Sequence, residues 1–434
     1  MSIPVVTVGH TRQDLVGGLE RLHGPVTVVR RCSALAELLA VCQGGLARAA
    51  VVAAGSEELT ASLVERLQSA GVAVVALADD PAEVSRLREL RAATAATGLE
   101  AAELAACIAD AVEELGRGGH AGRPSVESRA EAGAAGPDAA AGGPVGDTRA
   151  GSITAVWGPT GAPGRSTVAV NLAAEAAAAG REVILVDADT YGASVATMLG
   201  LLDESAGIAQ ACRLADQGLL DAPALLRVAA PVVIRSFQLR VLTGISRSSR
   251  WPELRAAALG RVLHRCRELA DLTVVDVGFP LESDEELSFD TAAPRRNAAA
   301  LHTLESADTI YAVGSADSIG VPRLVRGLAE LAEAVPGAAP QVLLNKVRPA
   351  AVGRSPERQL EEAWERYGPG APIRAFLPFD PRAADDALAA GSVLLESAPD
   401  SGLRRAVAGL VCAPAQHRSR AAGRLATALV RRSR

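Results

Sequence analysis

Short apolar runs alternate with longer amphipathic segments through the first 115 residues of the chain. Four apolar runs have the length of buried parallel strands: 4–8, 26–29, 49–53 and 72–77. The other segments carry apolar residues at helical spacing: 14–22, 34–46, 59–70, 81–93 and 99–115. A weak fifth strand is expected at 91–97. This series predicts an α/β unit with a small doubly wound sheet.

A second unit is expected after a break in this pattern. Residues 116–150 are rich in Gly, Ala, Pro and Ser and have no apolar period. They predict a flexible linker, because such a segment cannot bury enough surface to offset its ordering entropy. Residues 151–415 resume the alternation, which predicts a larger α/β domain with a mostly parallel sheet. Residues 416–434 form a basic tail with six arginines and a thin apolar stripe.

Composition narrows the class of protein. Of the 434 residues, 49% are apolar and 3% aromatic, so the cores must be built mainly from Ala, Val and Leu. The net charge of −6 argues against bulk attraction to nucleic acid or anionic lipid. The six cysteines are scattered without metal-ligand spacing, and we expect reduced thiols. The chain shows no signal peptide and no apolar run long enough to span a bilayer, so we expect a cytoplasmic protein.

A glycine-rich turn opens the second unit. An expected strand at 152–156 is followed by WGPTGAPGRST and then by an expected helix at 168–179, which is the context that a phosphate-binding loop requires. Glycines let the backbone N–H groups point inward, and the helix N-terminus favours an anion. Arg165 is the candidate phosphate-contacting cation, and Ser166 is a candidate Mg²⁺ ligand. The candidate binding residues are Gly158, Thr160, Gly161, Ala162, Pro163, Gly164, Arg165, Ser166 and Thr167.

Carboxylates follow two of the expected buried strands. Asp187 and Asp189 stand at the tip of the next strand, about 20 residues after the loop. Asp276 ends the apolar run 272–275 and is a candidate Walker B carboxylate, which would hold Mg²⁺ partly through water. A simpler interpretation stays open for Asp187 and Asp189, namely that they only cap the turn after the strand.

These motifs occur in the order found in MinD/ParA-type (SIMIBI) P-loop ATPases, which the chain resembles from the loop through VDAD and VVDVG to LLNK. The resemblance implies binding of ATP and Mg²⁺. It matches Asp187 to the first aspartate of the family's pair and Asp189 to the catalytic aspartate that orients water. It also places Asn345, Pro378 and Asp380 beside the base, although Asn345 is equally typical of strand-end turns.

Three departures from the family pattern concern the loop. Thr160 stands at the family's signature lysine, Arg165 replaces the general P-loop lysine, and Pro163 removes one backbone donor. ATP binding is therefore expected, while hydrolysis stays open. One hypothesis is a positioning ATPase, and the other is a nucleotide-sensing scaffold without turnover.

The first unit resembles a response-regulator receiver in order and length. Its first and third expected strands end in Val8-Gly9-His10 and Ala53-Ala54-Gly55, where a receiver carries its acidic residues. This predicts a pseudo-receiver used for docking or dimerisation. The combination resembles the CpaE/TadZ proteins, which implies a peripheral protein that localises pilus, secretion or septum-site assemblies through protein partners. A ParA-like role in chromosome partitioning is the alternative. Two further partner interactions stay open: formation of a homodimer, and contact of the basic tail with membrane or DNA.

Overall fold

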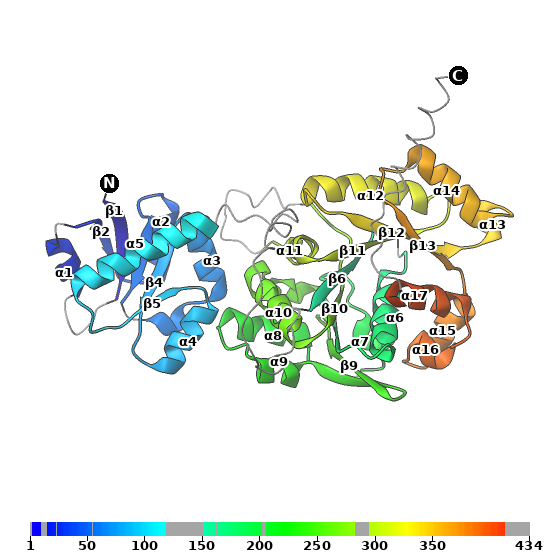
Figure 1. Ribbon diagram of the computed structural model, residues 1–434, viewed down its shortest axis with the longest axis horizontal. Coiled ribbons are helices and arrows are strands. Elements are labelled where there is room, and N and C mark those ends of the chain that lie inside the picture. The colour runs from blue at the N-terminus through cyan, green and yellow to red at the C-terminus, as the bar shows by residue number, and fades with distance from the viewer. Residues whose placement is uncertain are drawn as a thin grey trace, which may run out of the picture.

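The structure is a computed structural model that describes residues 2–9, 15–22, 24–53, 55–118, 151–161, 163–201, 205–282 and 295–412. Within this part of the chain two α/β units lie side by side (Figure 1). The predicted fold class, a smaller doubly wound unit followed by a larger unit with a mostly parallel sheet, is confirmed. None of the helices in the described residues is long and apolar enough to cross a membrane.

The first unit contains a five-stranded parallel sheet in the order β2-β1-β3-β4-β5. Its strands are β1 (Ile3–Val8), β2 (Val26–Cys32), β3 (Ala49–Val52), β4 (Ala73–Leu77) and β5 (Ala93–Ala95). Its helices are α1 (Leu15–Arg21), α2 (Leu35–Gln43), α3 (Ala61–Ser69), α4 (Pro81–Glu89) and α5 (Ala101–Gly118). All residues of β3 and β4 are buried, as expected for central parallel strands covered on both faces.

Helix α5 differs from the predicted linker boundary, because it continues through residues 116–118. An ion pair between Arg117 and Glu113, at 2.9 Å and one turn apart, accompanies this extra turn. The rest of the predicted linker and the whole basic tail lie outside the described residues.

The second unit contains an eight-stranded sheet in the order β13-β12-β11-β6-β10-β7-β9-β8. Every pairing is parallel except that between β8 and β9. The strands are β6 (Ser152–Trp157), β7 (Val183–Asp187), β8 (Ala230–Ile234), β9 (Phe237–Leu242), β10 (Leu272–Asp276), β11 (Thr309–Ser315), β12 (Pro340–Val347) and β13 (Ile373–Pro378).

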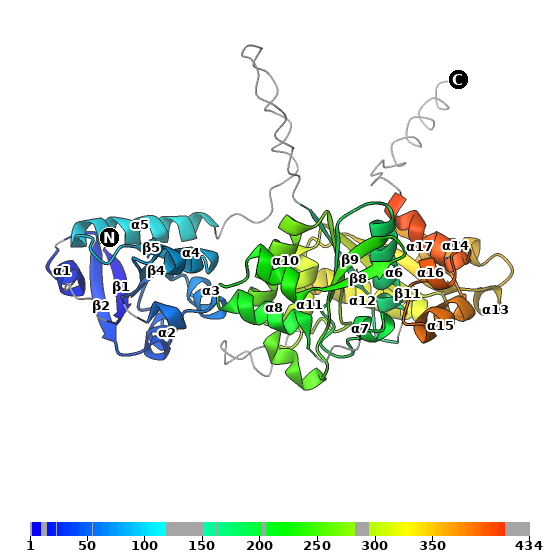
Figure 2. The ribbon, with the colours of Figure 1, turned by 90° about the horizontal axis from the view of Figure 1, so that it is seen from below.

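Helices cover both faces of this sheet (Figures 1 and 2). One face packs against α8 (Gly207–Asp216), α9 (Ala222–Val228), α10 (Ala256–Leu269), α11 (Ala298–Ser306), α12 (Gly320–Ala334) and α14 (Pro356–Tyr367). The other face packs against α6 (Arg165–Ala178), α7 (Val195–Met198), α15 (Pro381–Ala389), α16 (Leu394–Ser397) and α17 (Gly402–Cys412). The short helix α13 (Pro349–Val352) follows β12. Alternate residues of β6 therefore enter different cores, with Trp157 on one face and Val156 on the other.

The two units contact each other through α3 and α4 on one side and α8 and α10 on the other (Figure 2). The Ser62 backbone N–H and hydroxyl donate to the Asp216 carboxylate at 2.9 and 2.6 Å. Arg86 donates to the Gln217 carbonyl at 3.0 Å. These polar contacts thus join residues that are 131 and 154 positions apart in the sequence.

Candidate nucleotide site

The glycine-rich turn connects β6 to α6 at the carboxyl edge of the larger sheet. Gly161 and Gly164 have φ of 104° and 97°, a left-handed conformation that side chains other than glycine rarely adopt. Gly158 has no room for a Cβ, which would clash with the Val313 carbonyl oxygen of β11. Helix α6 begins at Arg165, three residues before the expected start, because the left-handed Gly164 already ends the loop. Ala162 lies outside the described residues.

Asn345 supports this turn from the end of β12. Its side-chain N–H donates to the Pro163 carbonyl oxygen at 2.7 Å, and its Oδ1 accepts the Lys346 backbone N–H at 2.8 Å. The side chain is buried, and a Cβ at Gly164 would clash with its amide nitrogen. Here Asn345 holds the loop, and its contact with a base stays a prediction.

Two of the predicted carboxylates lie side by side at the carboxyl ends of parallel strands. Asp276 of β10 is in register with Asp187 of β7 and with Val156 of β6. The Asp276 side chain is 1% exposed, and neither of its oxygens has a hydrogen-bond partner among the described residues. Burial and the neighbouring charge of Asp187 raise its pKa well above the usual range, and the adjacent Ser166 hydroxyl lowers it in part.

Asp187 has its oxygens engaged by the chain's own backbone. It accepts the Asp189 N–H at 3.2 Å and the N–H groups of Ser194 and Val195 at 3.0 Å each, at the start of α7. Burial raises the pKa of Asp187 to about 6, although these hydrogen bonds oppose the shift. The geometry matches the simpler interpretation of this residue, a carboxylate that fixes the turn after the strand.

Asp189 is also buried and faces the loop. Its Oδ1 accepts the N–H groups of Tyr191 at 2.8 Å and Gly192 at 3.0 Å. Its Oδ2 lies 3.4 Å from Nη2 of Arg165. The catalytic role predicted for Asp189 needs this second oxygen to be released towards a water molecule.

The Arg165 side chain folds back over the turn from which α6 starts. Its Nη1 donates to the carbonyl oxygens of Gly158 at 3.1 Å and Pro159 at 3.3 Å. The guanidinium also lies 6.0 Å from the centre of the Phe279 ring. The side chain is 12% exposed, and its buried Nε has no hydrogen-bond partner among the described residues. Arg165 therefore takes loop carbonyls and Asp189 as partners, at the position predicted to contact phosphate.

Arg323 of α12 is a site residue that the sequence analysis missed. A Cβ built on Gly161 would lie 2.6 Å from its Nη1, so the guanidinium lies directly beside the turn. The exposed Thr160 carries no charge at the position of the family's signature lysine. Arg323 thus supplies a cation from the same chain next to the turn. No pattern near residue 323 indicates this, because α12 meets the loop only in the folded sheet.

The residues expected beside the base lie where β13 ends. Pro378 is in register with Val347 of β12, and Asp380 caps α15 by accepting the Ala383 N–H at 3.2 Å. Between them Phe379 is exposed, with the Arg348 guanidinium 4.8 Å from its ring centre. The contact of Pro378 and Asp380 with a base stays a prediction.

The arrangement fits a Mg²⁺ ion held by Ser166 and Asp276. Asp276 presents two buried oxygens without partners among the described residues, and the Ser166 hydroxyl adjoins them. Mg²⁺ keeps several waters and takes few protein ligands when phosphates complete its shell. The described residues contain no group of three His, Cys, Asp or Glu side chains arranged to hold a metal by themselves.

Parts of this chain are similar to known proteins. The family model for ParA, described as NUBPL iron-transfer P-loop NTPase, matches residues 150–244. No curated protein matches the chain. The solved cell division ATPase MinD of Pyrococcus furiosus is similar at 20% identity, with a TM-score of 0.47, over 60% of this chain and 97% of that one. A ParA family ATPase of Chlorobium tepidum TLS is similar at 18% identity, with a TM-score of 0.49, over 60% and 98%. A chain of the MinC:MinD cell division protein complex of Aquifex aeolicus is similar at 17% identity, with a TM-score of 0.46, over 61% of this chain and 98% of that one.

The turn, the parallel sheet and the family match define the class of this unit, which is a P-loop NTPase domain. More narrowly, the matched segment, which contains the loop, Asp187 and Asp189, is of the MinD/ParA type. The family match confirms the MinD/ParA resemblance for this segment, and the CpaE/TadZ-like architecture stays a prediction.

Proposed function

We propose that this protein binds ATP and Mg²⁺ at the loop and uses the bound state to position a protein assembly in the cell. The observation that carries the proposal is Asp276, a buried carboxylate that has no hydrogen-bond partner among the described residues and adjoins Ser166 at the N-terminus of α6. An unpaired buried carboxylate is costly unless a cation joins it. Mg²⁺ bound to a nucleotide would supply that cation, and α6 would supply backbone donors to the phosphates.

Arg165 connects nucleotide binding to catalysis in this proposal. Its guanidinium and the Asp189 carboxylate engage each other at 3.4 Å. Phosphate oxygens are stronger partners for a guanidinium than backbone carbonyls, because both partners are then charged, and the 3.4 Å contact with Asp189 is longer than the roughly 2.7–2.9 Å of a charge-assisted hydrogen bond. Phosphate binding would draw Arg165 from Asp189 and leave Oδ2 to orient water, while Ser166 and Asp276 hold the metal. The alternative is a nucleotide-held scaffold, in which Arg165 stays on Asp189 and no turnover follows.

The first unit would serve as the docking element. It shares the parallel sheet of a receiver-like domain, and its strand tips carry no acidic residue at Gly9 or Ala53. We infer a CpaE/TadZ-like pseudo-receiver that recruits partners at a pole, septum or secretion assembly. Among the similar structures, MinD of Aquifex aeolicus was solved together with its partner MinC. A ParA-like role in chromosome partitioning is the second version of this function.

The description of the matching family names iron transfer. Iron binding would need suitable cysteine ligands in this chain. Cys212 and Cys266 are fully buried between α8 and α10, and burial raises the pKa of Cys266 to about 12. Iron–sulfur clusters are bound by cysteine thiolates, and burial of these two thiols favours the protonated form instead. We therefore favour nucleotide-dependent positioning over iron carriage for this chain.

Titration of the full-length protein with a fluorescent ATP analogue and Mg²⁺, together with a phosphate-release assay, tests the proposal. We expect binding that Arg165→Ala weakens at least tenfold and that the exposed control Arg358→Ala leaves unchanged. Phosphate release by the wild type that disappears in Asp189→Ala would identify the ATPase. Nucleotide binding without phosphate release would identify the scaffold. A wild-type protein that binds no nucleotide would refute the proposal.

A further inference from the structure

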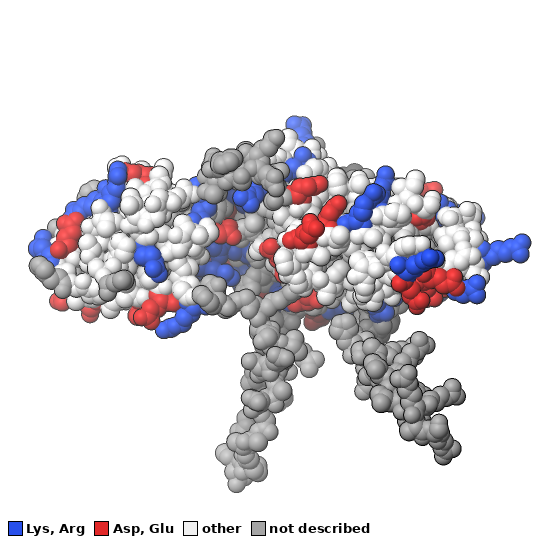
Figure 3. Space-filling view, turned by 90° about the horizontal axis from the view of Figure 1, so that it is seen from above, with Lys and Arg blue, Asp and Glu red and all other residues white. Residues whose placement is uncertain are grey.

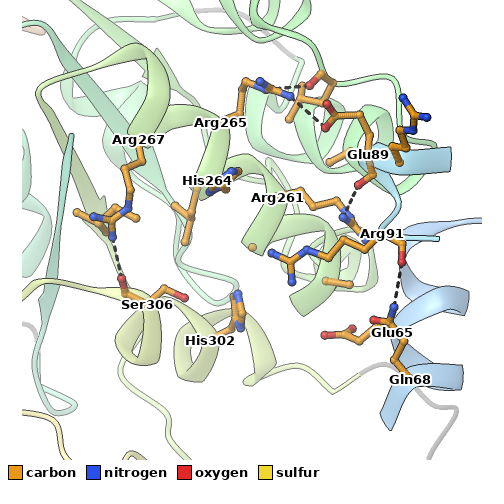
Figure 4. A pocket seen from close by; sticks show the side chains of 18 of the residues that line it. Glu65, Gln68, Glu89, Arg91, Arg261, His264, Arg265, Arg267, His302 and Ser306 are labelled. Atoms are coloured by element: carbon orange, nitrogen blue, oxygen red, sulfur yellow. Dashed lines mark hydrogen bonds and ion pairs between the residues drawn. The ribbon is translucent and has the colours of Figure 1, made fainter. Parts of the chain in front are cut away.

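A cavity of about 630 Å³ lies between the two units. Its walls come from α3 and the end of α4 on one side, and from α10 and α11 on the other (Figure 4). Ile153, at the amino end of β6, lines it, whereas the glycine-rich turn follows the carboxyl end of the same strand. The cavity is thus separate from the candidate nucleotide site. Its volume lies within the range of pockets that hold small organic ligands.

Positive charge is concentrated in this cavity. Five arginines line it (Arg88, Arg91, Arg261, Arg265 and Arg267), against two glutamates. The lining therefore carries a formal charge of +3 with neutral histidines, in a chain whose net charge is −6. Basic side chains are visible in the recess between the units (Figure 3). Walls of one sign around a hollow concentrate counter-ions of the other sign.

Part of this charge has no partner among the residues that the structure describes. The Arg88 and Arg91 side chains make no hydrogen bond or ion pair with another described residue. Arg261 donates to two neutral carbonyl oxygens, those of Glu89 at 2.5 Å and Leu90 at 3.0 Å, and its Nε is buried without a partner. Burial, and then the charge of Arg91, lower the pKa of Arg261. An anion between these two guanidinium groups would relieve their repulsion.

The backbone at Arg91 supports a role for its side chain. Arg91 follows the C-terminus of α4 with a φ of 59°, a left-handed position usually taken by glycine or asparagine. Arginine at this position accepts a conformational cost that glycine would avoid. The side chains of Arg91, Arg261 and His302 reach the same space from three different elements (Figure 4).

We propose that this cavity binds a phosphate-bearing small molecule of nucleotide size, held by Arg88 and Arg91 of the first unit and Arg261 of the second. Guanidinium groups recognise phosphate through paired N–H donors. A phosphate would therefore give the three arginines charged acceptors, which an apolar ligand would not. The ligand would touch both units at the point where Arg261 already joins α10 to the end of α4. Its binding would therefore link the receiver-like unit to the NTPase unit.

Calorimetric titration of the full-length protein with pyrophosphate in Mg²⁺-free buffer tests this site. We expect a binding component that Arg91→Gln and Arg88→Gln each weaken at least tenfold. The matched control is Arg48→Gln, an exposed arginine of the same unit outside the cavity, which should bind as the wild type does. Thermal unfolding of each variant checks that the fold is kept, which we expect because both cavity arginines are exposed.

The Arg165→Ala background separates this site from the nucleotide site. Pyrophosphate binding should persist there, and AMP should bind with at least the same affinity if the ligand is of nucleotide size. The proposal is overturned if no pyrophosphate binds, if binding disappears in Arg165→Ala, or if Arg91→Gln and Arg48→Gln bind equally. Failure of AMP to bind would overturn the nucleotide-sized ligand. None of these results depends on ATP binding at the glycine-rich turn.

Discussion

At the scale of single residues, the buried carboxylates divide by the partners of their oxygens. The Asp187 oxygens accept hydrogen bonds from backbone N–H groups. One Asp189 oxygen accepts from backbone N–H groups, and the other contacts Arg165. Asp276 has no such partners among the described residues, although it is equally buried. A buried carboxylate without partners lowers the stability of the folded protein. Such carboxylates are typical of ligand and metal sites.

Asp276→Asn should stabilise the protein without nucleotide. A pKa raised on folding means that the folded state holds its proton more tightly than the unfolded one, so the wild type loses stability as pH rises above the usual pKa of 3.8. The amide carries no charge, and we expect the free energy of unfolding at pH 8 to rise by about 1–3 kcal/mol, because a buried polar group without a partner costs about that much and a charged one more. Urea unfolding at pH 5 and pH 8 measures this, and a gain as large at pH 5 as at pH 8 would contradict it.

Arg165→Lys should raise phosphate release relative to the wild type. Lysine keeps the charge but lacks the forked geometry that lets Arg165 bind the loop carbonyls and Asp189 together. We expect a severalfold increase in the rate at saturating ATP, measured by phosphate release, with binding changed less than tenfold. Slower release than in the wild type would show that the guanidinium itself is required for turnover.

At the scale of elements, the site is built by bringing one loop and several strand ends to the same edge. Parallel register places Asp276 beside Asp187, and Ser315 of β11 beside Asn345 of β12. Asn345 then fastens the loop through Pro163, two residues before α6 begins at Arg165, with the left-handed Gly164 between them. The loop is therefore positioned by the sheet as well as by its own glycines.

Gly164→Ala tests this support, with Gly180→Ala as the matched control. Both glycines have a left-handed φ, but an added Cβ meets the Asn345 amide at Gly164 and nothing within 4 Å at Gly180. We expect Gly180→Ala to cost about 1 kcal/mol of unfolding free energy from its backbone alone. Gly164→Ala should cost about 1–2 kcal/mol more and weaken ATP binding at least tenfold. Denaturant unfolding and nucleotide titration of both variants measure this, and equal losses would remove the role of Asn345.

At the scale of the whole molecule, two α/β units meet through polar contacts between helices. The Asp216 carboxylate accepts two hydrogen bonds from Ser62 of the other unit and lies 3.7 Å from Arg255 of its own. Beside this contact lies the basic cavity, so the join between the units and the proposed ligand site adjoin each other. A ligand bound in the cavity would therefore contact both units next to the place where they already meet.

Asp216→Ala should loosen the join between the units. It leaves the Ser62 donors without their acceptor, and a double-mutant cycle with Ser62→Ala should give a coupling energy of about 0.5–1.5 kcal/mol. Small-angle X-ray scattering should show a larger radius of gyration for Asp216→Ala than for the control Asp400→Ala. Asp400 lies outside the contact between the two units. Identical scattering from both variants would mean that this contact does not hold the units together.

The sequence by itself determined the strand and helix pattern, the glycine-rich turn and the strand-end carboxylates, because these depend on local backbone preference, burial and parallel strand order. It also predicted a site with Arg165, Ser166 and Asp276, and these three side chains do lie near one another. Only the tertiary structure decided that Asp187 and Asn345 are engaged by the chain itself, and that Arg323 lies beside Gly161. The cavity between the units was likewise beyond the sequence. Such contacts join residues far apart along the chain, and their geometry is set by packing rather than by local pattern.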